Sequence, residues 1–390
     1  MDYQVVWRGP VHDMSGYGTA SRGYVLALDR VGVDVKVETY TQRGFPYTGR
    51  GSLGRESGRL SALIGKRYAA NKPKVLIWHG SPWLIDARNL KDTFDRIILN
   101  TVWETNRIPR AWVPVIRQFD CVCVPSMMNE SAVRSGGVAG PVFVVPHGVD
   151  THSFRPDNEK LRVYETDGKF VFVSVFDFQH RKNPETLLRA YWEQFQKHDD
   201  VALVIKTFPG TRKRPGVMPE AAMLEYKRRL GFGNGTAPLV VLPCRLDEPM
   251  YRGLYTLGDA FVLPTRGEGV GLPFLEALAS GVPVIATGWG GQTDYANDRS
   301  SFLVDYRLEE PSRSMGSKHA IAPLYRGLFD SGGQLWAEAD LHDLRRKMKQ
   351  AFDNPELCRQ KGRQGRADMA LWSWDRAGEA WKRVVEHVLG

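Results

Sequence analysis

Short apolar runs alternate with amphipathic stretches along the first part of the chain. The apolar runs have the length of strands and lie at residues 4–7, 34–39, 74–78, 96–101, 121–125 and 142–146. Between them, apolar residues recur at helical spacing, for example at 20–30 and 130–135. Strands and helices that alternate in this way are typical of a parallel sheet covered by helices.

The same alternation restarts after a polar segment at 147–160, which contains Pro156 and which we interpret as a linker. Strand-like runs follow at 170–176, 202–206, 238–242, 261–264, 284–287 and 301–304, with helical patterns at 184–196 and 273–279 among others. The pattern predicts an α/β chain of two Rossmann-like, doubly wound domains, at residues 1–150 and 151–373. Residues 306–334 fit neither pattern, and we expect an ordered insertion or loop there.

The composition is that of a globular protein with room for two hydrophobic cores. The chain has 390 residues, of which 42% are hydrophobic and 25% charged. No apolar run approaches the ~20 residues of a membrane span, and the start, MDYQVVWRGP, is expected to be the first strand and not a signal peptide. The four cysteines lack zinc-like or secreted-scaffold spacing, so we expect reduced thiols and a cytoplasmic protein.

The formal net charge of +9 is accompanied by basic clusters at 206–216, 226–231 and 344–349. Such runs are commonly solvated faces. Two alternatives stay open, namely a phosphate-rich ligand and peripheral contact with an anionic membrane surface at the inner face of the membrane. No zinc finger, RNP-type aromatic motif or other nucleic-acid module accompanies the clusters, so no nucleic-acid partner is expected.

The segment TRGEGVGLPFLEALASGVPVIATG, residues 265–288, contains a glycine-rich turn between a strand and a helix. In a doubly wound sheet, ligands bind outside the carboxyl ends of the strands, and this turn follows such an end. The backbone amides around Gly269, Gly271 and Leu272 lead into a helix with Pro273 in its first turn. Amides beside a positive helix end suit a phosphate or a sugar hydroxyl.

Two glutamates, Glu268 and Glu276, stand eight positions apart across this turn. A carboxylate at Glu276 can accept two hydroxyl hydrogen bonds, as a ribose offers, while Glu268 on the loop faces the other end of the same ligand. Taken alone, Glu276 is equally explained as a carboxylate stabilised by the helix dipole. Together with the glycines, the pair predicts a site for a nucleotide joined to a sugar.

The same segment resembles the Glu-(seven residues)-Glu signature of the retaining glycosyltransferases of family 4, the group 1 glycosyltransferases. The likeness is strongest over 254–287, with weaker similarity at 15–28, 121–126, 144–154, 176–191, 336–348 and 373–381. The resemblance implies the GT-B fold, in which an acceptor-side domain and a donor domain face each other across a cleft. It also implies that the C-terminal helix, 374–390, packs back on the first domain.

The resemblance assigns a basic pair to the donor diphosphate. In the family such a pair follows the first strand of the second domain, and here Arg181 and Lys182 occupy that position. Family members often carry a further arginine where this chain has Phe176, so either Lys206 meets part of the diphosphate charge or the site is weaker. Two cations suit a pyrophosphate leaving group, because charge develops on it as the bond to the sugar breaks. A solvated loop pair is the alternative.

The resemblance also gives each glutamate a role. Glu276 is expected to bond the ribose, and Glu268, which we take as catalytic, to contact the transferred sugar. Neither is expected to be a nucleophile, because the family's reaction is usually described as front-face, with the leaving phosphate taking the proton of the acceptor. This agrees with a sequence that offers no Ser-His-Asp set.

Candidate residues of the first domain lie after its strands. Gly16 and Gly18 resemble the family's glycine-rich loop, whose amides approach the donor phosphate. They also form a partial G-x-G-x-x-G with Ser21 at the third glycine, and Glu38 stands where a dinucleotide fold places its ribose carboxylate, which keeps a dehydrogenase open. His79 resembles the family's histidine that approaches the donor sugar, and the alternative is a histidine bonded to the backbone.

An acceptor site is predicted at residues 101–109, which follow another strand. There Trp103 would offer an aromatic surface beside Glu104 and Arg107, although the start of a helix explains the segment equally well. His147 is expected to be structural, at the hinge between the domains.

The prediction as a whole is a retaining hexosyltransferase. It would move a sugar from a nucleotide-diphospho-sugar donor to a hydroxyl of a glycan or lipid-linked acceptor, without a metal ion or cofactor. No Asp-x-Asp follows a strand, and Glu338 and Asp340 precede a helical segment as its cap. The alternatives are a GT-B relative with epimerase or phosphorylase chemistry, and a non-catalytic sugar-nucleotide-binding protein.

Overall fold

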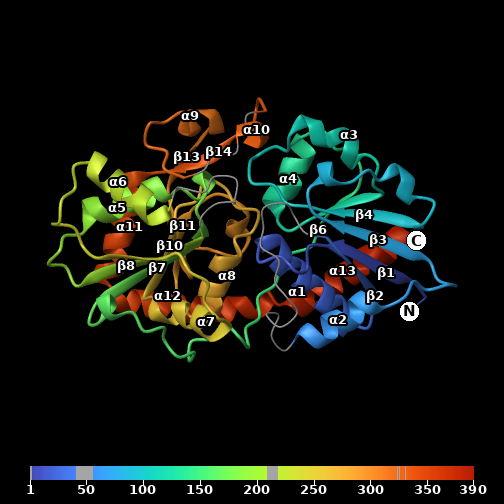
Figure 1. Ribbon diagram of the computed structural model, residues 1–390, viewed down its shortest axis with the longest axis horizontal. Helices are drawn as coiled ribbons and strands as arrows, with labels where there is room; N and C mark the ends of the chain where they lie inside the picture. The colour runs from blue at the N-terminus through green and yellow to red at the C-terminus, as the bar shows by residue number, and fades with distance from the viewer. Residues whose placement is uncertain (1, 41–55, 209–217, 323, 325, 330) are drawn as a thin grey trace. The chain divides into compact units, whose positions relative to one another are not determined.

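The computed structural model describes residues 2–40, 56–208, 218–322, 324, 326–329 and 331–390. By its internal contacts the chain divides into two compact units (Figure 1). Unit 1 comprises Met1–Gly148 and Leu371–Gly390, and unit 2 comprises Val149–Ala370. The chain therefore leaves unit 1 once and returns to it with its last residues.

Unit 1 is built on a six-stranded parallel sheet with the order β2-β1-β3-β4-β5-β6. Its strands are β1 (Gln4–Gly9), β2 (Asp34–Thr39), β3 (Lys74–His79), β4 (Arg96–Asn100), β5 (Cys121–Val124) and β6 (Val142–Val144). Its helices are α1 (Gly16–Arg30), α2 (Ser57–Gly65), α3 (Val113–Ile116), α4 (Met127–Ser135) and α13 (Trp374–Leu389). The strand order reverses at β1, which has β2 on one side and β3 on the other, and this is where doubly wound sheets bind ligands.

The last helix, α13, belongs to the core of unit 1. The ring of Trp381 is fully buried, and its centroid lies 5.6 Å from that of Trp7 on β1 and 5.7 Å from that of Tyr24 on α1. The helices α1 and α13 approach closely at Gly378, where an added Cβ would lie 2.8 Å from the backbone oxygen of Ala27. Apolar residues at helical spacing give α13 the stripe that it buries here.

Unit 2 contains a second six-stranded parallel sheet with the order β12-β11-β10-β7-β8-β9. Its strands are β7 (Phe170–Asp177), β8 (Val201–Phe208), β9 (Leu239–Leu242), β10 (Ala260–Leu263), β11 (Val284–Thr287) and β12 (Ser301–Val304). Its longer helices are α5 (Pro184–Gln194), α6 (Pro219–Arg229), α7 (Glu248–Leu257), α8 (Leu272–Ala279), α11 (Leu341–Asp353) and α12 (Pro355–Asp368). The order reverses between β7 and β10, so the ends of these two strands are where a ligand is expected.

Unit 2 also carries a small antiparallel sheet of two strands. β13 (Tyr306–Glu309) pairs with β14 (Trp336–Ala339), and the short helices α9 (Pro311–Met315) and α10 (Arg326–Phe329) lie between them in the chain. Residues 306–334, expected to be an insertion or loop, thus contain one strand of this sheet and both short helices. We call β13 and β14 the small sheet below.

The α/β fold class with two doubly wound parallel sheets, predicted from the sequence, is confirmed. Residues 104–107, for which the start of a helix was the alternative explanation, form bends, and a 3-10 helix begins only at Arg110. Cys121 and Cys123 are free and buried. Within the part of the chain that the structure describes, no helix combines the length and apolar character needed to cross a membrane.

Candidate active site

The loop after β10 turns sharply into α8. Gly271 is the N-cap of α8 and has a φ of 80°, in the left-handed region that favours glycine, and a proline stands in the first turn. The hydroxyl of Tyr295 donates to the carbonyl oxygens of Val270 (2.6 Å) and Gly271 (3.1 Å) and so fixes the loop. Among the described residues, no acceptor takes a hydrogen bond from the amides of Val270, Gly271 or Leu272. These amides can therefore bind an anion.

Arg181, Lys182 and Glu268 form a charged cluster at the ends of β7 and β10. Arg181 and Lys182 belong to a 3-10 turn at His180–Lys182, directly after β7, and Glu268 lies on the loop after β10. The Lys182 Nζ lies 2.5 Å from Oε1 of Glu268, and a guanidinium nitrogen of Arg181 lies 3.4 Å from the same oxygen. Arg181 also donates to the carbonyl oxygen of Gly267. The structure thus brings three predicted site residues together at the reversal point of the sheet.

Glu268 is ionised in this cluster. Burial alone would raise the pKa of its carboxyl group, but the charges of Lys182 and Arg181 outweigh burial and hold the pKa below its ordinary value. The hydroxyl of Thr265 donates to Glu268 as well, at 3.1 Å. Two cations thus contact one carboxylate.

Glu276 lies on α8 in a different environment. It is the fifth residue of the helix, and Oε2 accepts hydrogen bonds from the hydroxyls of Tyr251 (2.8 Å) and Tyr255 (2.5 Å) on α7. Oε1 has no hydrogen-bond partner within the described residues. Burial raises the pKa of Glu276 to about 7, although the two tyrosine hydroxyls oppose this effect. The carboxyl group is therefore held in place by one oxygen and offers the other.

The raised pKa predicts a pH-dependent stability. Between its ordinary pKa of 4.5 and about 7, Glu276 binds more protons folded than unfolded, so the free energy of unfolding should fall as pH rises through this window. The full loss, above about pH 7, amounts to roughly 3 kcal/mol. Glu276→Gln should remove this loss, which urea unfolding at pH 5 and pH 8 would measure. The exposed Glu220→Gln is the control. If the free energy of unfolding falls with pH as steeply in Glu276→Gln as in the wild type, the carboxyl of Glu276 is not the cause of the pH dependence.

Lys206 is not part of the cluster. Its side chain is 2% exposed, and the ammonium lies 3.2 Å from the centroid of the Phe208 ring. Burial lowers the pKa of Lys206 to about 8, against the attraction of Cys244 and Asp177. Of the described contacts, none joins its ammonium to Arg181, Lys182 or Glu268. Its predicted role at the diphosphate therefore has no contact to support it.

In unit 1, Gly16 and Gly18 open α1 directly after β1. The hydroxyl of Ser15 caps the helix by accepting from the amide of Gly18 at 3.2 Å. A Cβ on Gly18 would lie 2.1 Å from the carbonyl oxygen of Asp13, whereas a Cβ on Gly16 would meet nothing within 4 Å. Packing within the unit therefore explains Gly18, and only the position of Gly16 is open to a ligand.

This difference gives a matched pair of variants. Gly18→Ala should destabilise unit 1 by about 1–3 kcal/mol, because the new methyl group must displace the Asp13 carbonyl. Gly16→Ala should cost nothing measurable, since the space around it is open and alanine suits a helix. Thermal unfolding of both variants measures the difference. An equal melting temperature for the two would show that the Asp13 carbonyl moves aside without a measurable loss of stability.

His79, at the end of β3, has both ring nitrogens engaged. Nε2 donates to the carbonyl oxygen of Tyr17 at 3.2 Å, and Nδ1 lies 2.7 Å from the side-chain nitrogen of Asn100. The side chain is 3% exposed, and burial lowers the pKa of His79 to about 3, so the ring is neutral. These contacts match the alternative of a histidine bonded to the backbone. His147 is half-buried, with its ring against Tyr24.

Trp103, predicted as part of an acceptor surface, is buried in the structure. The side chain is 4% exposed, its indole N–H donates to Thr105 Oγ1 (2.7 Å) and to the carbonyl oxygen of Arg107 (2.9 Å), and its ring packs on Trp112. These contacts lie within the loop, and none of them supports the predicted acceptor role of Trp103. Glu104 and Arg107 are half-buried on the same loop.

Four residues of the site were not predicted from the sequence: Arg266, Tyr251, Tyr255 and Tyr295. Tyr251 and Tyr255 stand four positions apart on α7, a spacing that places both hydroxyls on one face of a helix. That spacing was the available signal. The partner of this face, Glu276, became visible only in the structure, and the same is true of Tyr295 and of the buried Arg266.

The arrangement in unit 2 suits a ligand with a diphosphate and hydroxyl groups. The cluster and the amides at the start of α8 supply positive charge and donors, and Glu276 supplies an acceptor. Within the described residues, no group of three or more His, Cys, Asp or Glu side chains is placed to hold a metal ion.

Comparison with known proteins supports this assignment. Residues 167–312 match the family model described as "Glycosyl transferases group 1". A GDP-mannose-dependent alpha-(1-6)-phosphatidylinositol monomannoside mannosyltransferase of Mycobacterium tuberculosis is 31% identical over 201 residues, which are 48% of this chain and 49% of that protein. D-inositol 3-phosphate glycosyltransferase 2 of Catenulispora acidiphila is 28% identical over 228 residues, 57% of this chain and 47% of the relative. The chain thus spans about half the length of the curated relatives it matches.

Solved structures of similar fold extend over the whole chain. Sucrose-phosphate synthase from Thermosynechococcus elongatus has a TM-score of 0.67 at 16% identity and covers 99% of both chains. HepE of Anabaena, solved with UDP and glucose, has a TM-score of 0.64 at 12% identity and covers 99% of this chain and 100% of its own. At these identities the likeness is one of fold, and the predicted GT-B fold is confirmed.

Proposed function

We propose that this chain, whose residues 167–312 belong to the group 1 glycosyltransferases, transfers a hexosyl group from a nucleoside diphosphate sugar to an acceptor hydroxyl. The observation that carries the proposal is the cluster of Arg181, Lys182 and Glu268 at the reversal point between β7 and β10. The basic pair and the glutamate come from separate segments of the chain, yet they contact each other beside the amides that open α8. The diphosphate would occupy this positive region.

The ligand would extend from the cluster in two directions. The ribose hydroxyls would donate to Oε1 of Glu276, the oxygen that the tyrosines leave open. The sugar would lie at Glu268, whose carboxylate can accept from its hydroxyls. Lys182 then has two partners, Glu268 and the diphosphate, and as negative charge grows on the leaving group the ammonium stabilises the transition state more than the ground state.

We propose retention of configuration without a metal ion. The sequence resembles retaining enzymes, and Arg181, Lys182 and the α8 amides would supply positive charge where a metal would otherwise stand. In a front-face reaction the leaving phosphate takes the proton of the acceptor hydroxyl, so no separate base is required of the protein. The expected product has the anomeric configuration of the donor, and transfer continues in EDTA.

The acceptor is proposed to be a glycan or a lipid-linked molecule in the cytoplasm, at the inner face of the membrane. Relatives named for phosphatidylinositol mannoside and inositol phosphate acceptors favour a polyol bearing phosphate or lipid. The net charge of +9 and the basic last turn of α6, at Lys227, Arg228 and Arg229, suit an anionic surface. Sedimentation with vesicles that contain anionic lipid, compared with neutral vesicles, tests the membrane contact.

Release of nucleoside diphosphate tests the function. The chain is incubated with GDP-mannose, UDP-glucose and other sugar nucleotides, with and without polyol phosphates and glycans. We expect one donor to be cleaved faster in the presence of an acceptor, with a glycosylated product whose anomeric proton coupling matches that of the donor. Binding without turnover of any donor would favour the non-catalytic alternative, and an epimerised sugar nucleotide would favour the epimerase.

A further inference from the structure

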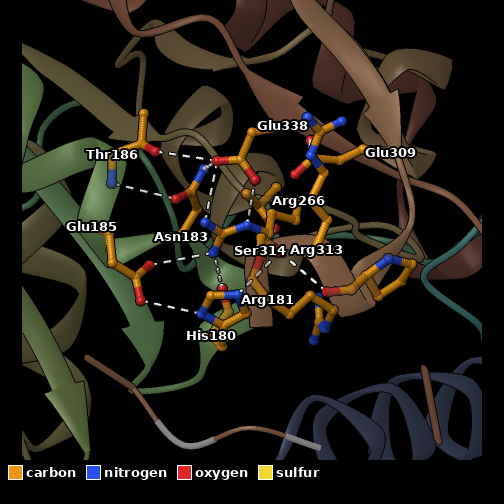
Figure 2. Close-up of polar contacts among 12 residues, drawn as sticks. His180, Arg181, Asn183, Glu185, Thr186, Arg266, Glu309, Arg313, Ser314 and Glu338 are labelled. Carbon is orange, nitrogen blue, oxygen red and sulfur yellow. Dashed lines mark hydrogen bonds and ion pairs between the residues drawn. The ribbon is translucent and has the colours of Figure 1, made fainter. Parts of the chain in front are cut away.

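A buried guanidinium, that of Arg266, lies beside the charged cluster without belonging to it. The side chain is 4% exposed, and it forms a two-pronged contact with Glu338 on β14, from Nε to Oε2 at 2.7 Å and from the terminal nitrogen to Oε1 at 3.2 Å. The other terminal nitrogen donates to Glu185 on α5 at 3.3 Å and to the carbonyl oxygen of His180. Figure 2 shows these partners grouped around Arg266.

The backbone of Arg266 joins the same segments. Its amide donates to the carbonyl oxygen of Arg181 at 2.8 Å, and its carbonyl oxygen accepts from the amide of Ala337 on β14 at 2.8 Å. Arg266 therefore holds the turn that carries the basic pair, and it stands two residues before Glu268 in the loop that carries the carboxylate. The relative placement of Lys182 and Glu268 depends on these bonds.

The carboxylates around Arg266 have further partners of their own. Glu185 accepts from His180 Nδ1 (3.1 Å) and from the amide of Ile321 (2.9 Å). Glu338 contacts the side chains of Asn183 (3.3 Å) and Thr186 (3.4 Å) at the start of α5. Burial alone would raise the pKa of Glu185, but Arg266 and His180 lower it to about 2. Glu185 is thus ionised, and the hydrogen bonds of the network join the start of α5, the loop after β10 and β14.

Stability alone does not account for such a network. A buried group of ion pairs loses hydration on folding, and well-packed apolar residues of the same volume are often as stabilising or more so. The ionic arrangement adds directional hydrogen bonds, which apolar packing lacks. Each of these bonds fixes a specific oxygen or nitrogen in space. The oxygens fixed here include the carbonyl of His180, which directly precedes the basic pair, and the carbonyl of Arg181 within it.

We infer that Arg266 is a positioning residue for glycosyl transfer, and that the small sheet, through Glu338, helps to position the residues of the donor site. The inference rests on the proposed function. Neither residue touches the ligand; both set the distance between the basic pair and Glu268. A shift of about 1 Å in that distance would cost on the order of a hundredfold in rate. The sheet of β13 and β14, which no part of the transfer reaction otherwise requires, gains a role by this inference.

Glu338→Gln is the test variant. It keeps the shape of the side chain and leaves Arg266 paired with Glu185, so the guanidinium is not stranded. We expect kcat to fall about tenfold to a hundredfold and the affinity for inorganic pyrophosphate, measured by calorimetry, to fall about tenfold, with the KM of the acceptor unchanged. The matched control is Glu309→Gln on β13, a buried carboxylate that pairs with Arg307 and Arg313 and not with Arg266.

The outcomes separate the inference from the function on which it rests. A folded Glu338→Gln with the kcat and pyrophosphate affinity of the wild type, or the same losses in Glu309→Gln, would overturn the inference alone. A wild-type chain that binds neither pyrophosphate nor any sugar nucleotide would overturn the proposed function and the inference with it. If circular dichroism shows that Glu338→Gln is unfolded, Glu185→Gln, which keeps the two-pronged contact, takes its place under the same readouts.

Discussion

Replacing Lys182 by alanine should lower the rate of glycosyl transfer by about a hundredfold to a thousandfold. The ammonium lies 2.5 Å from Glu268 and its side chain is 13% exposed, so it acts in surroundings that water screens little. It would meet the negative charge that develops on the leaving diphosphate, and that interaction is strongest in the transition state. The measurement is nucleoside diphosphate release at saturating donor, where a loss of binding alone no longer limits the rate.

Lys197→Ala is the control for this variant. Lys197 is an exposed lysine of the same unit, outside the charged cluster, and its removal changes the net charge equally. The control should retain wild-type activity. Equal rates for Lys182→Ala and the wild type would show that the basic pair is only a solvated loop pair with no role in transfer.

Replacing Trp381 by alanine should destabilise unit 1 by about 3–5 kcal/mol. The ring is fully buried between Trp7 and Tyr24, with centroids 5.6 and 5.7 Å away, and its loss leaves a cavity that the sheet cannot close. Denaturant unfolding followed by near-ultraviolet circular dichroism measures the change. The large effect is expected because α13, the last helix in the chain, completes the core that the first strand begins.

Leu371→Ala is the matched control, since that side chain is 63% exposed at the boundary of unit 1, and it should cost under about 0.5 kcal/mol. Binding of pyrophosphate by Trp381→Ala is the second readout. The cluster of Arg181, Lys182 and Glu268 lies within unit 2, so its affinity should survive at temperatures below the unfolding of that unit. A loss of stability below 1 kcal/mol would contradict the core role of α13.

Much of the fold could be predicted because its strands are buried on both faces. The expected bounds 34–39, 284–287 and 301–304 coincide with β2, β11 and β12, and the other strands of the two parallel sheets differ by one or two residues at one or both ends. Buried parallel strands produce continuous apolar runs, which are a strong local signal. The small sheet of β13 and β14 has no such continuous apolar run, because β13 is mostly exposed and its partner strand lies far along the chain.

The candidate site, like the fold, could be predicted only in part from the sequence. Arg181, Lys182, Glu268 and Glu276 follow strand ends or open a helix in a recognisable segment, and the structure places the first three in contact. What surrounds them depends on packing between distant segments. Neither the two-pronged contact of Arg266 with Glu338 nor the burial of Trp103 is encoded in local spacing. Glu338 was expected to help cap a helix, whereas only Asp340 does so.

The most direct test of the donor site is thermal unfolding in the presence of UDP-, GDP-, dTDP- and ADP-sugars. A ligand that binds the folded chain raises its apparent stability by RT ln(1 + [L]/Kd), about 2.7 kcal/mol at a hundredfold excess over Kd. We predict that at least one sugar nucleotide raises the melting temperature with saturation, and that Lys182→Ala and Glu276→Ala each reduce the effect. No stabilisation by any of the four classes at millimolar concentration, or equal stabilisation of the wild type and both variants, would contradict a nucleoside diphosphate sugar site at this cluster.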